Sequence, residues 1–265
     1  MGRDIVVFTL HKSGSMFLHR QCEMLCAASG LAYHSPNVPA CGLDARRLLT
    51  DRDLWRTRHG CFAPVRFYVE IPEIENYDVL LHLRDPRDVL VSMFYSYCYT
   101  HPGAVAPNTG FRKAAAEAGI DAFVLAKASG LSTQFPGDYG TGGHVEDLIG
   151  DLRRRYRDYI SHVLGQPNVT LLRYEEMVSD YPAWLAKFAR PFPLEHRQAH
   201  LEEWAAKSAS FFPQRTSDVM HHVRHVTPGD FRAKLTPTTI HRLDEIFSDT
   251  LTALGYPRFI SAQGR

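Results

Sequence analysis

The feature that most constrains the fold is a strand-length apolar run that leads through a polar loop into a helix. Residues 4–10 (DIVVFTL) form one such run, and residues 77–83 (YDVLLHL) form another. Continuous apolar runs of this length are typical of central strands that are covered on both faces. Apolar residues at helical spacing follow each run, over residues 16–28 and 86–99. The alternation predicts an α/β fold, a three-layer sandwich in which helices cover both faces of a central parallel sheet.

The rest of the chain continues the same pattern. Asp85 is a suitable N-cap, Pro86 suits the first helical position, and Asp88 can complete a capping box. A third strand is predicted at residues 168–172. Further helices are predicted at residues 113–128, 145–164, 181–189, 195–209 and 238–254. Without an internal repeat or a low-complexity linker, we expect one domain over residues 1–265, with a glycine-rich insertion or lid at about 100–143.

Composition excludes several classes of protein. The 30 Lys and Arg against 29 Asp and Glu give a formal charge of +1, which argues against a dedicated nucleic-acid or anionic-membrane surface. No apolar run approaches the ~18 residues that span a bilayer. The five cysteines are an odd number and form no CxxC pair, so we expect a cytoplasmic protein from a reducing compartment.

The fourteen histidines raise the question of a metal site. His196 and His200 are four residues apart on a predicted helix, and residues 221, 222 and 225 are histidines in a predicted loop. No HExxH motif or zinc-finger spacing accompanies them, so we predict no metal.

The first loop has the chemistry of an anion site. Lys12, Ser13, Gly14 and Ser15 lie between a strand and a helix N-terminus, where free N–H groups and the helix dipole favour a phosphate. The spacing is not that of GxxxxGK[ST]. Arg84 also occupies the strand end where a nucleoside triphosphatase needs a carboxylate for magnesium. We therefore predict a P-loop-like phosphate loop that works without a metal.

Two further basic segments accompany this loop. Arg84 ends the second strand, and Ser92 lies about two helical turns further on, so both could hold one phosphate. A simpler interpretation is that Arg84 pairs with Asp88. A loop at residues 224–231 adds Arg224 and His225.

Together the three segments carry a resemblance. Residues 11–15 (HKSGS) resemble the 5′-phosphosulfate loop of sulfotransferases that use 3′-phosphoadenosine 5′-phosphosulfate (PAPS) and release 3′,5′-diphosphoadenosine (PAP). Residues 84–92 (RDPRDVLVS) closely resemble the 3′-phosphate segment of that family. Residues 224–231 look like a diverged copy of its third motif. The resemblance implies transfer of a sulfuryl group from PAPS to a hydroxyl or amine by in-line displacement.

The resemblance also implies roles for individual residues. Lys12, His59 and Ser92 are the expected catalytic residues, with Lys12 at the phosphosulfate bridge. The 5′-phosphate of the donor would be held by backbone N–H groups of residues 13–17 (Ser13, Gly14, Ser15, Met16 and Phe17). The residues expected near its 3′-phosphate are Arg84, Ser92, Arg224 and His225. Those expected at its adenine are Tyr174, Ser210 and Phe211. His11, Met16 and Phe17 depart from the usual proline, threonine and tryptophan, and Phe17 can still stack on adenine.

The base and the acceptor are less directly encoded. The resemblance implies that His59 is the base, because many family members use a histidine from a Lys-Thr-His motif roughly 20-odd residues before the arginine, and residues 56–59 (RTRH) lie in that interval. Imidazole is a type of group suited to this task, and His34 and Glu70 are the alternatives. Aromatic residues at 111, 123, 135 and 139 favour a small phenol, alcohol or polyketide-like acceptor over a carbohydrate. Two other classes stay open: a P-loop kinase or nucleotide hydrolase, and an inactive nucleotide-binding module.

Overall fold

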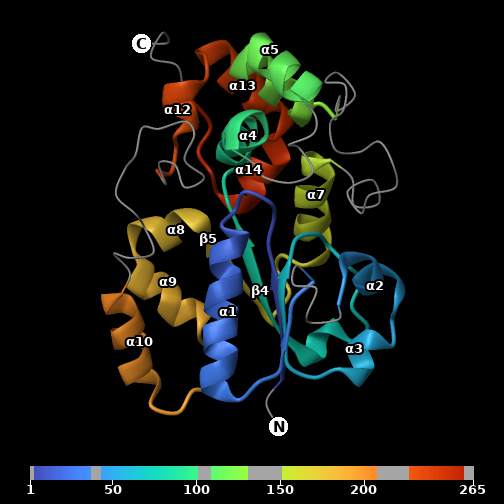
Figure 1. The fold of residues 1–265 in the computed structure, drawn as a ribbon, viewed down its shortest axis with the longest axis vertical. Coiled ribbons are helices and arrows are strands. Elements are labelled where there is room, and N and C mark those ends of the chain that lie inside the picture. Colours follow the sequence, from blue (N-terminus) through green and yellow to red (C-terminus); the bar gives the residue numbers. More distant parts are fainter. Residues whose placement is uncertain (1–2, 37–42, 101–108, 131–150, 208–226, 260–265) are drawn as a thin grey trace. The chain divides into compact units, whose positions relative to one another are not determined.

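The described part of the chain divides into two compact units. The computed structural model describes residues 3–36, 43–100, 109–130, 151–207 and 227–259 (Figure 1). The first unit comprises residues 1–84 and 161–213, and the second comprises residues 85–160 and 214–265. The single domain over 1–265 stays a prediction.

The first unit is built on a parallel sheet of five strands. These are β1 (Asp4–Phe8), β2 (Tyr33–His34), β3 (Cys61–Val65), β4 (Tyr77–Leu83) and β5 (Val169–Arg173). Their spatial order is β2-β3-β1-β4-β5, and every neighbouring pair is parallel. The predicted α/β class is confirmed, and the three predicted strands correspond to β1, β4 and β5.

The strand register fixes which residues share an edge of this sheet. Asp4 pairs with Tyr77, and Ile5 pairs with Cys61, so β1, β3 and β4 start near one edge. Leu83 pairs with Arg173 where β4 and β5 end. Residues that follow the strands therefore lie at the opposite edge, which we call the carboxyl edge.

Helices cover both faces of the sheet. Consecutive residues of a strand point to opposite faces. The thiol of Cys61 makes a hydrogen bond with the thiol of Cys26 on α1 (Ser15–Ser29), whereas the next residue, Phe62, packs on Trp55 of α3 (Leu54–Thr57) with ring centroids 4.8 Å apart. The α1 face also carries α8 (Tyr174–Ser179) and α9 (Tyr181–Phe188), and the unit is completed by α2 (Ala45–Thr50) and α10 (Arg197–Ala206) (Figure 1).

The second unit is helical in its described residues. It contains α4 (Pro86–Tyr95), the π-helical turn Ser96–Thr100, α5 (Thr109–Ala128), most of α7 (Leu152–His162), α12 (Phe231–Lys234), α13 (Pro237–Ile246) and α14 (Ser248–Leu254). The helix predicted over 238–254 is thus two helices that meet at Phe247. A residue with non-helical angles, Gly119 at φ 81°, also interrupts α5.

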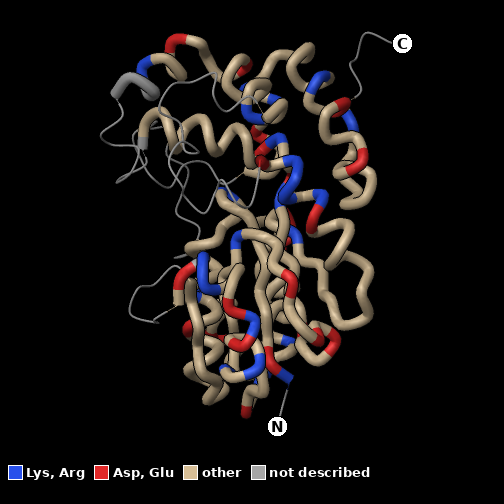
Figure 2. The backbone as a smooth tube through the Cα atoms, turned by 90° about the vertical axis from the view of Figure 1, so that its right-hand side faces the viewer, with Lys and Arg blue, Asp and Glu red and all other residues tan. Residues whose placement is uncertain are grey.

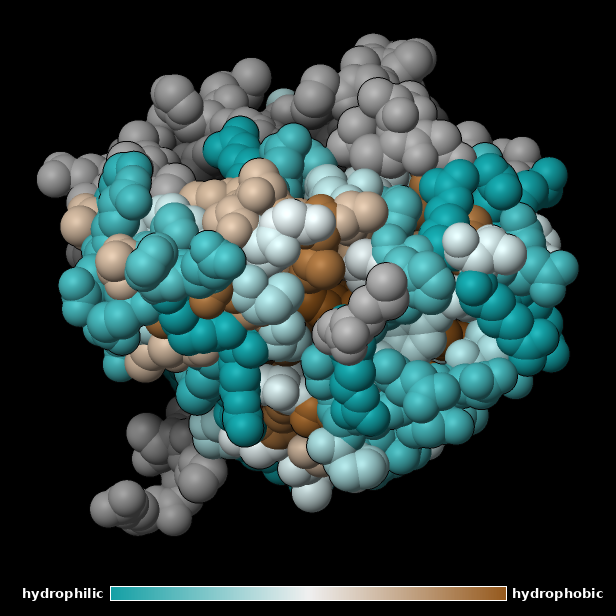
Figure 3. All heavy atoms as spheres, turned by 90° about the horizontal axis from the view of Figure 1, so that it is seen from below, coloured by the Kyte–Doolittle hydropathy of each residue, from teal (hydrophilic) through white to brown (hydrophobic). Residues whose placement is uncertain are grey.

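Polar residues dominate one face of the molecule and are spread along the described backbone. Basic and acidic positions are scattered as short segments along a described backbone that is mostly of other residues (Figure 2), and the face in Figure 3 is mainly hydrophilic with smaller apolar areas. Of the large apolar residues in the described ranges, only Met16 is exposed, at 53%. No described helix is long and apolar enough to cross a bilayer.

Candidate anion-binding site

The carboxyl edge of the sheet brings together three basic residues and one aromatic residue. Arg66 follows β3, Lys12 lies in the loop after β1, Arg84 follows β4, and Tyr174 follows β5. Since these strands are consecutive neighbours, the four residues lie in the order Arg66, Lys12, Arg84, Tyr174 along the edge. Ligands of open α/β sheets bind at this edge.

The loop after β1 has a backbone that few residues other than glycine adopt. Gly14 has φ 78° and Lys12 has φ 65°, both in the left-handed region. A Cβ atom on Gly14 would lie 3.2 Å from the ring of Tyr174, so only glycine fits without displacing that ring. Helix α1 starts at the next residue, and the N–H groups of its first turn have no partner within the helix. The loop therefore presents both N–H groups and Lys12 to an anion.

One of the backbone N–H groups that the sequence predicts to bind the anion already has a hydrogen-bond partner within the protein. The N–H of Ser13 donates to the carbonyl of Leu10 at 3.3 Å. The side chain of Ser13 is fully buried, and its hydroxyl makes no hydrogen bond with a described residue. Of the predicted backbone donors, those from Ser15 to Phe17 are the first-turn groups of α1.

Arg84 lies between the loop and the aromatic ring. Its Nη1 donates to the carbonyl of Lys12 at 3.0 Å, and its guanidinium carbon lies 4.3 Å from the centre of the Tyr174 ring. Arg84 is 6% exposed, and Tyr174 is 7% exposed. These contacts fix the direction of the guanidinium, which is what an arginine that binds one phosphate requires.

Arg66 is a site residue that the sequence analysis missed. Its Nη1 lies 3.3 Å from Nε2 of His11, and its Nη2 lies 3.4 Å from Sδ of Met16. Arg66 follows the apolar strand CFAPV just as Arg84 follows YDVLLHL. The signal was present, but the proline and short length of CFAPV hid the strand.

Lys12 experiences the combined effect of these cations. Burial, together with the nearby positive charges of Arg84 and Arg66, lowers the pKa of Lys12 to about 8. A bound anion would remove this repulsion. The repulsion among these three positive charges therefore favours the binding of a polyanion.

Phe17 has a different neighbourhood from the one predicted. Its ring lies 5.9 Å from that of Tyr181 and 6.0 Å from that of Trp184, both on α9. These contacts place the ring in the packing between α1 and α9. Stacking of Phe17 on an adenine stays a prediction.

The structure does not bring His59 to Lys12. His59 precedes β3, and its Nδ1 lies 2.9 Å from Oδ2 of Asp4, the first residue of β1. It thus lies at the edge where strands begin, and the four steps from Asp4 to Phe8 alone span ~13 Å. The error came from a distance counted along the chain, which does not tell whether a residue precedes or follows its strand.

The two alternative bases also have other partners. His34, on β2, has its Nε2 3.0 Å from the carbonyl of His59. Glu70 forms an exposed ion pair with Arg52 at 3.1 Å. Neither has a described contact with Lys12.

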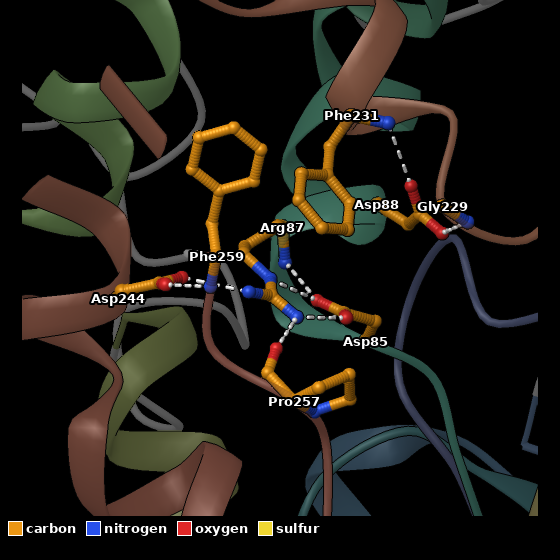
Figure 4. A network of polar contacts seen from close by, with 8 residues as sticks. All are labelled: Asp85, Arg87, Asp88, Gly229, Phe231, Asp244, Pro257 and Phe259. Atoms are coloured by element: carbon orange, nitrogen blue, oxygen red, sulfur yellow. Dashed lines mark hydrogen bonds and ion pairs between the residues drawn. The ribbon is translucent and has the colours of Figure 1, made fainter. Parts of the chain in front are cut away.

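Ser92 belongs to the second unit, where α4 carries a buried polar network (Figure 4). Asp85 accepts from the N–H of Arg87 at 2.9 Å, which confirms it as the N-cap. Asp88 directs both carboxylate oxygens to the third motif, accepting from the N–H groups of Gly229 at 2.7 Å and Phe231 at 3.0 Å. This pairing joins two segments that lie far apart in the sequence, and the predicted capping box stays a prediction.

Arg87 supports the same segment from inside the unit. The residue is fully buried, and it pairs with Asp85 at 2.6 Å and with Asp244 at 2.7 Å. The two carboxylates more than offset the effect of burial and raise its pKa. Its guanidinium also stacks on Phe231, 4.2 Å from the ring centre. Arg87 is therefore a structural residue of α4.

Part of the predicted lid is core. Helix α5 packs in the second unit, where Phe123 is fully buried and lies 5.4 Å from the ring of Phe94. Phe123 therefore does not line an acceptor site. Side chains at 111, 135 and 139 lie outside the described residues.

Several other predicted residues also lie outside the described part of the chain, namely Ser210, Phe211, Arg224 and His225. The same holds for the histidines at 221 and 222. Among the residues that are described, no group of three or more His, Cys, Asp or Glu side chains could hold a metal. Four cysteines within the described ranges, at 22, 26, 61 and 98, are free thiols.

Comparison with known proteins agrees with this geometry. The family model described as "Sulfotransferase domain" matches residues 73–255. Among solved structures, mouse sulfotransferase SULT7A1 complexed with PAP aligns with a TM-score of 0.61 and 20% identity, covering 94% of this chain and 85% of that one. A retinol dehydratase with androsterone and inactive cofactor PAP aligns at 0.57 and 14% identity, covering 94% and 80%. No curated protein sequence matches.

Proposed function

The chain belongs to the sulfotransferase family, and from this premise we propose that it moves a sulfuryl group from PAPS to a hydroxyl or amine of a small molecule. The observation that carries the proposal is the meeting of Arg66, Lys12 and Arg84 at the ends of three adjacent strands. A donor with two phosphate groups and one sulfuryl group needs several fixed positive charges. PAP leaves as the product.

The donor is held by the groups of the loop and of the strand ends. Lys12 contacts the oxygen that bridges phosphorus and sulfur, and the first-turn N–H groups of α1 bind the 5′-phosphate. Arg84 binds the 3′-phosphate, and Tyr174 lies on the adenine side of it. The assignment of Ser92 and Arg224 to the 3′-phosphate rests on the motifs.

The transfer is a single displacement. The acceptor oxygen or nitrogen attacks sulfur, and the bond between sulfur and the bridging oxygen breaks. Its electron pair stays on the phosphate of PAP, where the charge of Lys12 stabilises it, and the proton of the acceptor passes to a base or to water. Positioning and preorganised charge supply most of the acceleration, as in phosphoryl transfer.

A small alcohol or phenol is the proposed acceptor. Two solved retinol dehydratase structures, which share 14% identity with this chain, hold androsterone or retinol together with PAP. Both compounds are apolar molecules with a hydroxyl group, in line with the aromatic content of the chain. A carbohydrate is the alternative acceptor, and transfer to simple sugars is compared with transfer to alcohols and phenols.

The test compares PAP with ATP and magnesium by isothermal titration calorimetry. We expect tighter binding of PAP, with no need for a metal, whereas tighter binding of ATP would support a kinase or hydrolase. Transfer of labelled sulfate from PAPS is then measured on phenols, steroid alcohols and simple sugars. Lys12→Ala should lower turnover by about 10²–10³-fold, and Lys187→Ala, which removes an exposed lysine paired with Glu176, is the control. PAP binding without turnover on any acceptor would favour an inactive module.

A further inference from the structure

His11 lies on the side of Lys12 from which the acceptor approaches. As in phosphoryl transfer, the attacking atom and the leaving oxygen lie in line, so the acceptor reaches sulfur from the side opposite the bridging oxygen. In the proposed function that oxygen is at Lys12, and the rest of the donor extends toward Arg84 and Tyr174, on the β4 and β5 side. The acceptor therefore arrives from the β3 side of Lys12, where the proposed function names no residue that takes its proton.

The contact between His11 and Arg66 places the imidazole on this side. His11 follows β1 and directly precedes Lys12, whereas Arg66 follows β3, the neighbour of β1 on the side away from β4. Nε2 of His11 lies 3.3 Å from Nη1 of Arg66. His11 is half-buried, so part of the residue is accessible to a molecule bound at the carboxyl edge.

The same contact requires a neutral ring with the lone pair on Nε2. An arginine is always charged and can only donate hydrogen bonds, so Nε2 of His11 is the acceptor and Nδ1 carries the proton. A neutral imidazole with a lone pair directed to this side of the site is the form that a general base needs. The bond is longer than the usual length of about 2.9–3.0 Å, so an acceptor hydroxyl can replace the guanidinium as the partner of Nε2.

We propose, building on the proposed function, that His11 is the general base of the transfer. Nε2 takes the proton of the acceptor hydroxyl while the oxygen forms its bond to sulfur and the bond between sulfur and the bridging oxygen breaks. The electron pair of the broken bond stays on the phosphate of PAP. The imidazolium lies beside the positive charges of Lys12 and Arg66, which favour release of the proton to water once the products leave. Position 11 is a proline in the motif that the loop resembles, so this base is particular to the present chain.

The test compares two acceptors that differ in their need for a base. An aliphatic alcohol keeps its proton, whereas a nitrophenol is already ionised in mildly alkaline solution. His11→Gln can still accept from Arg66 but cannot take a proton. It should lower kcat by about 10²-fold or more with the alcohol and by less than about threefold with the nitrophenol. The matched control His200→Gln, which removes an imidazole stacked on Trp204, should change neither rate.

Two readouts distinguish a base from a residue that only supports the loop. The dissociation constant of PAP, measured by calorimetry, should be the same for the wild type and His11→Gln, because the base does not hold the nucleotide. Added imidazole should restore part of the alcohol reaction in His11→Ala, since a free base can enter the space that the side chain leaves. Absence of this rescue in a folded variant, as verified by thermal melting, would overturn the inference.

Two other residues are tested as rival bases. Tyr68 lies two residues after Arg66, and its ring stacks on that of His162 with centroids 4.8 Å apart. His59 is the base that the motif implies. A loss confined to the alcohol in Tyr68→Phe or His59→Gln, without such a loss in His11→Gln, would assign the base to that residue and refute the proposal.

The outcomes separate the inference from the function on which it rests. If the wild type neither binds PAP nor transfers sulfate to either acceptor, the proposed function fails. If the wild type uses both acceptors and His11→Gln lowers both rates alike, or neither of them, the function stands and His11 is not the base.

Discussion

A buried histidine beneath the phosphate loop should make the first unit sensitive to acid. His82 lies on β4, is fully buried, and faces the rings of Tyr174 and Trp184, 6.3 and 5.7 Å away. Neither ring nitrogen makes a hydrogen bond with a described residue. Burial lowers the pKa of His82 from 6.5 to about 3, and the nearby backbone of Ser13 offsets this only in part. The folded unit therefore keeps His82 neutral, whereas the unfolded chain protonates it below pH 6.5.

The sign and size of the effect follow from this difference. Below the unfolded pKa of 6.5 the unfolded state binds one more proton, so the free energy of unfolding decreases as the pH falls and levels off near the folded pKa of about 3. One pH unit corresponds to about 1.36 kcal/mol. Between about pH 7.5 and about pH 5 the expected loss is thus about 2 kcal/mol.

Urea unfolding followed by tryptophan fluorescence measures this loss. All three tryptophans, at 55, 184 and 204, belong to the first unit, so the signal reports that unit. The variant His82→Leu lacks the titrating group, and its stability should fall about 2 kcal/mol less than that of the wild type over the same pH change. His59→Gln removes a 79% exposed imidazole and should follow the wild type. Parallel pH profiles of wild type and His82→Leu would refute the reasoning.

Three further variants test the loop and the α4 network. The affinity for PAP should fall as the pH rises through about 8, where Lys12 loses its charge, and Lys12→Arg should move that fall to higher pH, as calorimetry would show. Gly14→Ala combines a left-handed backbone with a Cβ 3.2 Å from the Tyr174 ring. It should cost more than the about 1–2 kcal/mol of backbone strain expected for Gly30→Ala, which meets nothing within 4 Å; equal losses in urea unfolding would exclude the ring contact. Asp88→Asn replaces one acceptor oxygen by a donor facing a backbone N–H, and should destabilise the second unit by about 1–3 kcal/mol. Unchanged thermal melting would show that the pairing contributes nothing.

Much of the sheet could be predicted from local sequence. The runs at 4–10 and 77–83 are mostly apolar because β1 and β4 are covered on both faces, and that is a property of each run alone. The N-cap at Asp85 is equally local. The break at Phe247 was missed because apolar residues keep helical spacing across it, so periodicity alone does not mark the boundary.

Residues whose role depends on distant partners could not be predicted in this way. Asp88 was predicted to complete a capping box in its own helix or to pair with Arg84, because these are the partners visible within a few residues. Asp88 also accepts hydrogen bonds from the backbone N–H groups of Gly229 and Phe231, and no pattern around Asp88 predicts these distant partners. Motif resemblance identified both segments, but not the bond between them.

The position of a residue relative to its strand explains both the success at Arg84 and the failure at His59. In a parallel sheet every strand runs in one direction, so a residue after a strand reaches the carboxyl edge and a residue before it reaches the other edge. Arg84 was placed correctly because the strand before it was recognised. His59 was misplaced because β3, which starts two residues later, was not. Recognition of β3 would have excluded His59 and selected Arg66 by the same rule, and Arg66 is the residue in contact with the phosphate loop. In a fold of this kind, the strand end is thus a better guide to a site residue than its distance along the chain from a known motif.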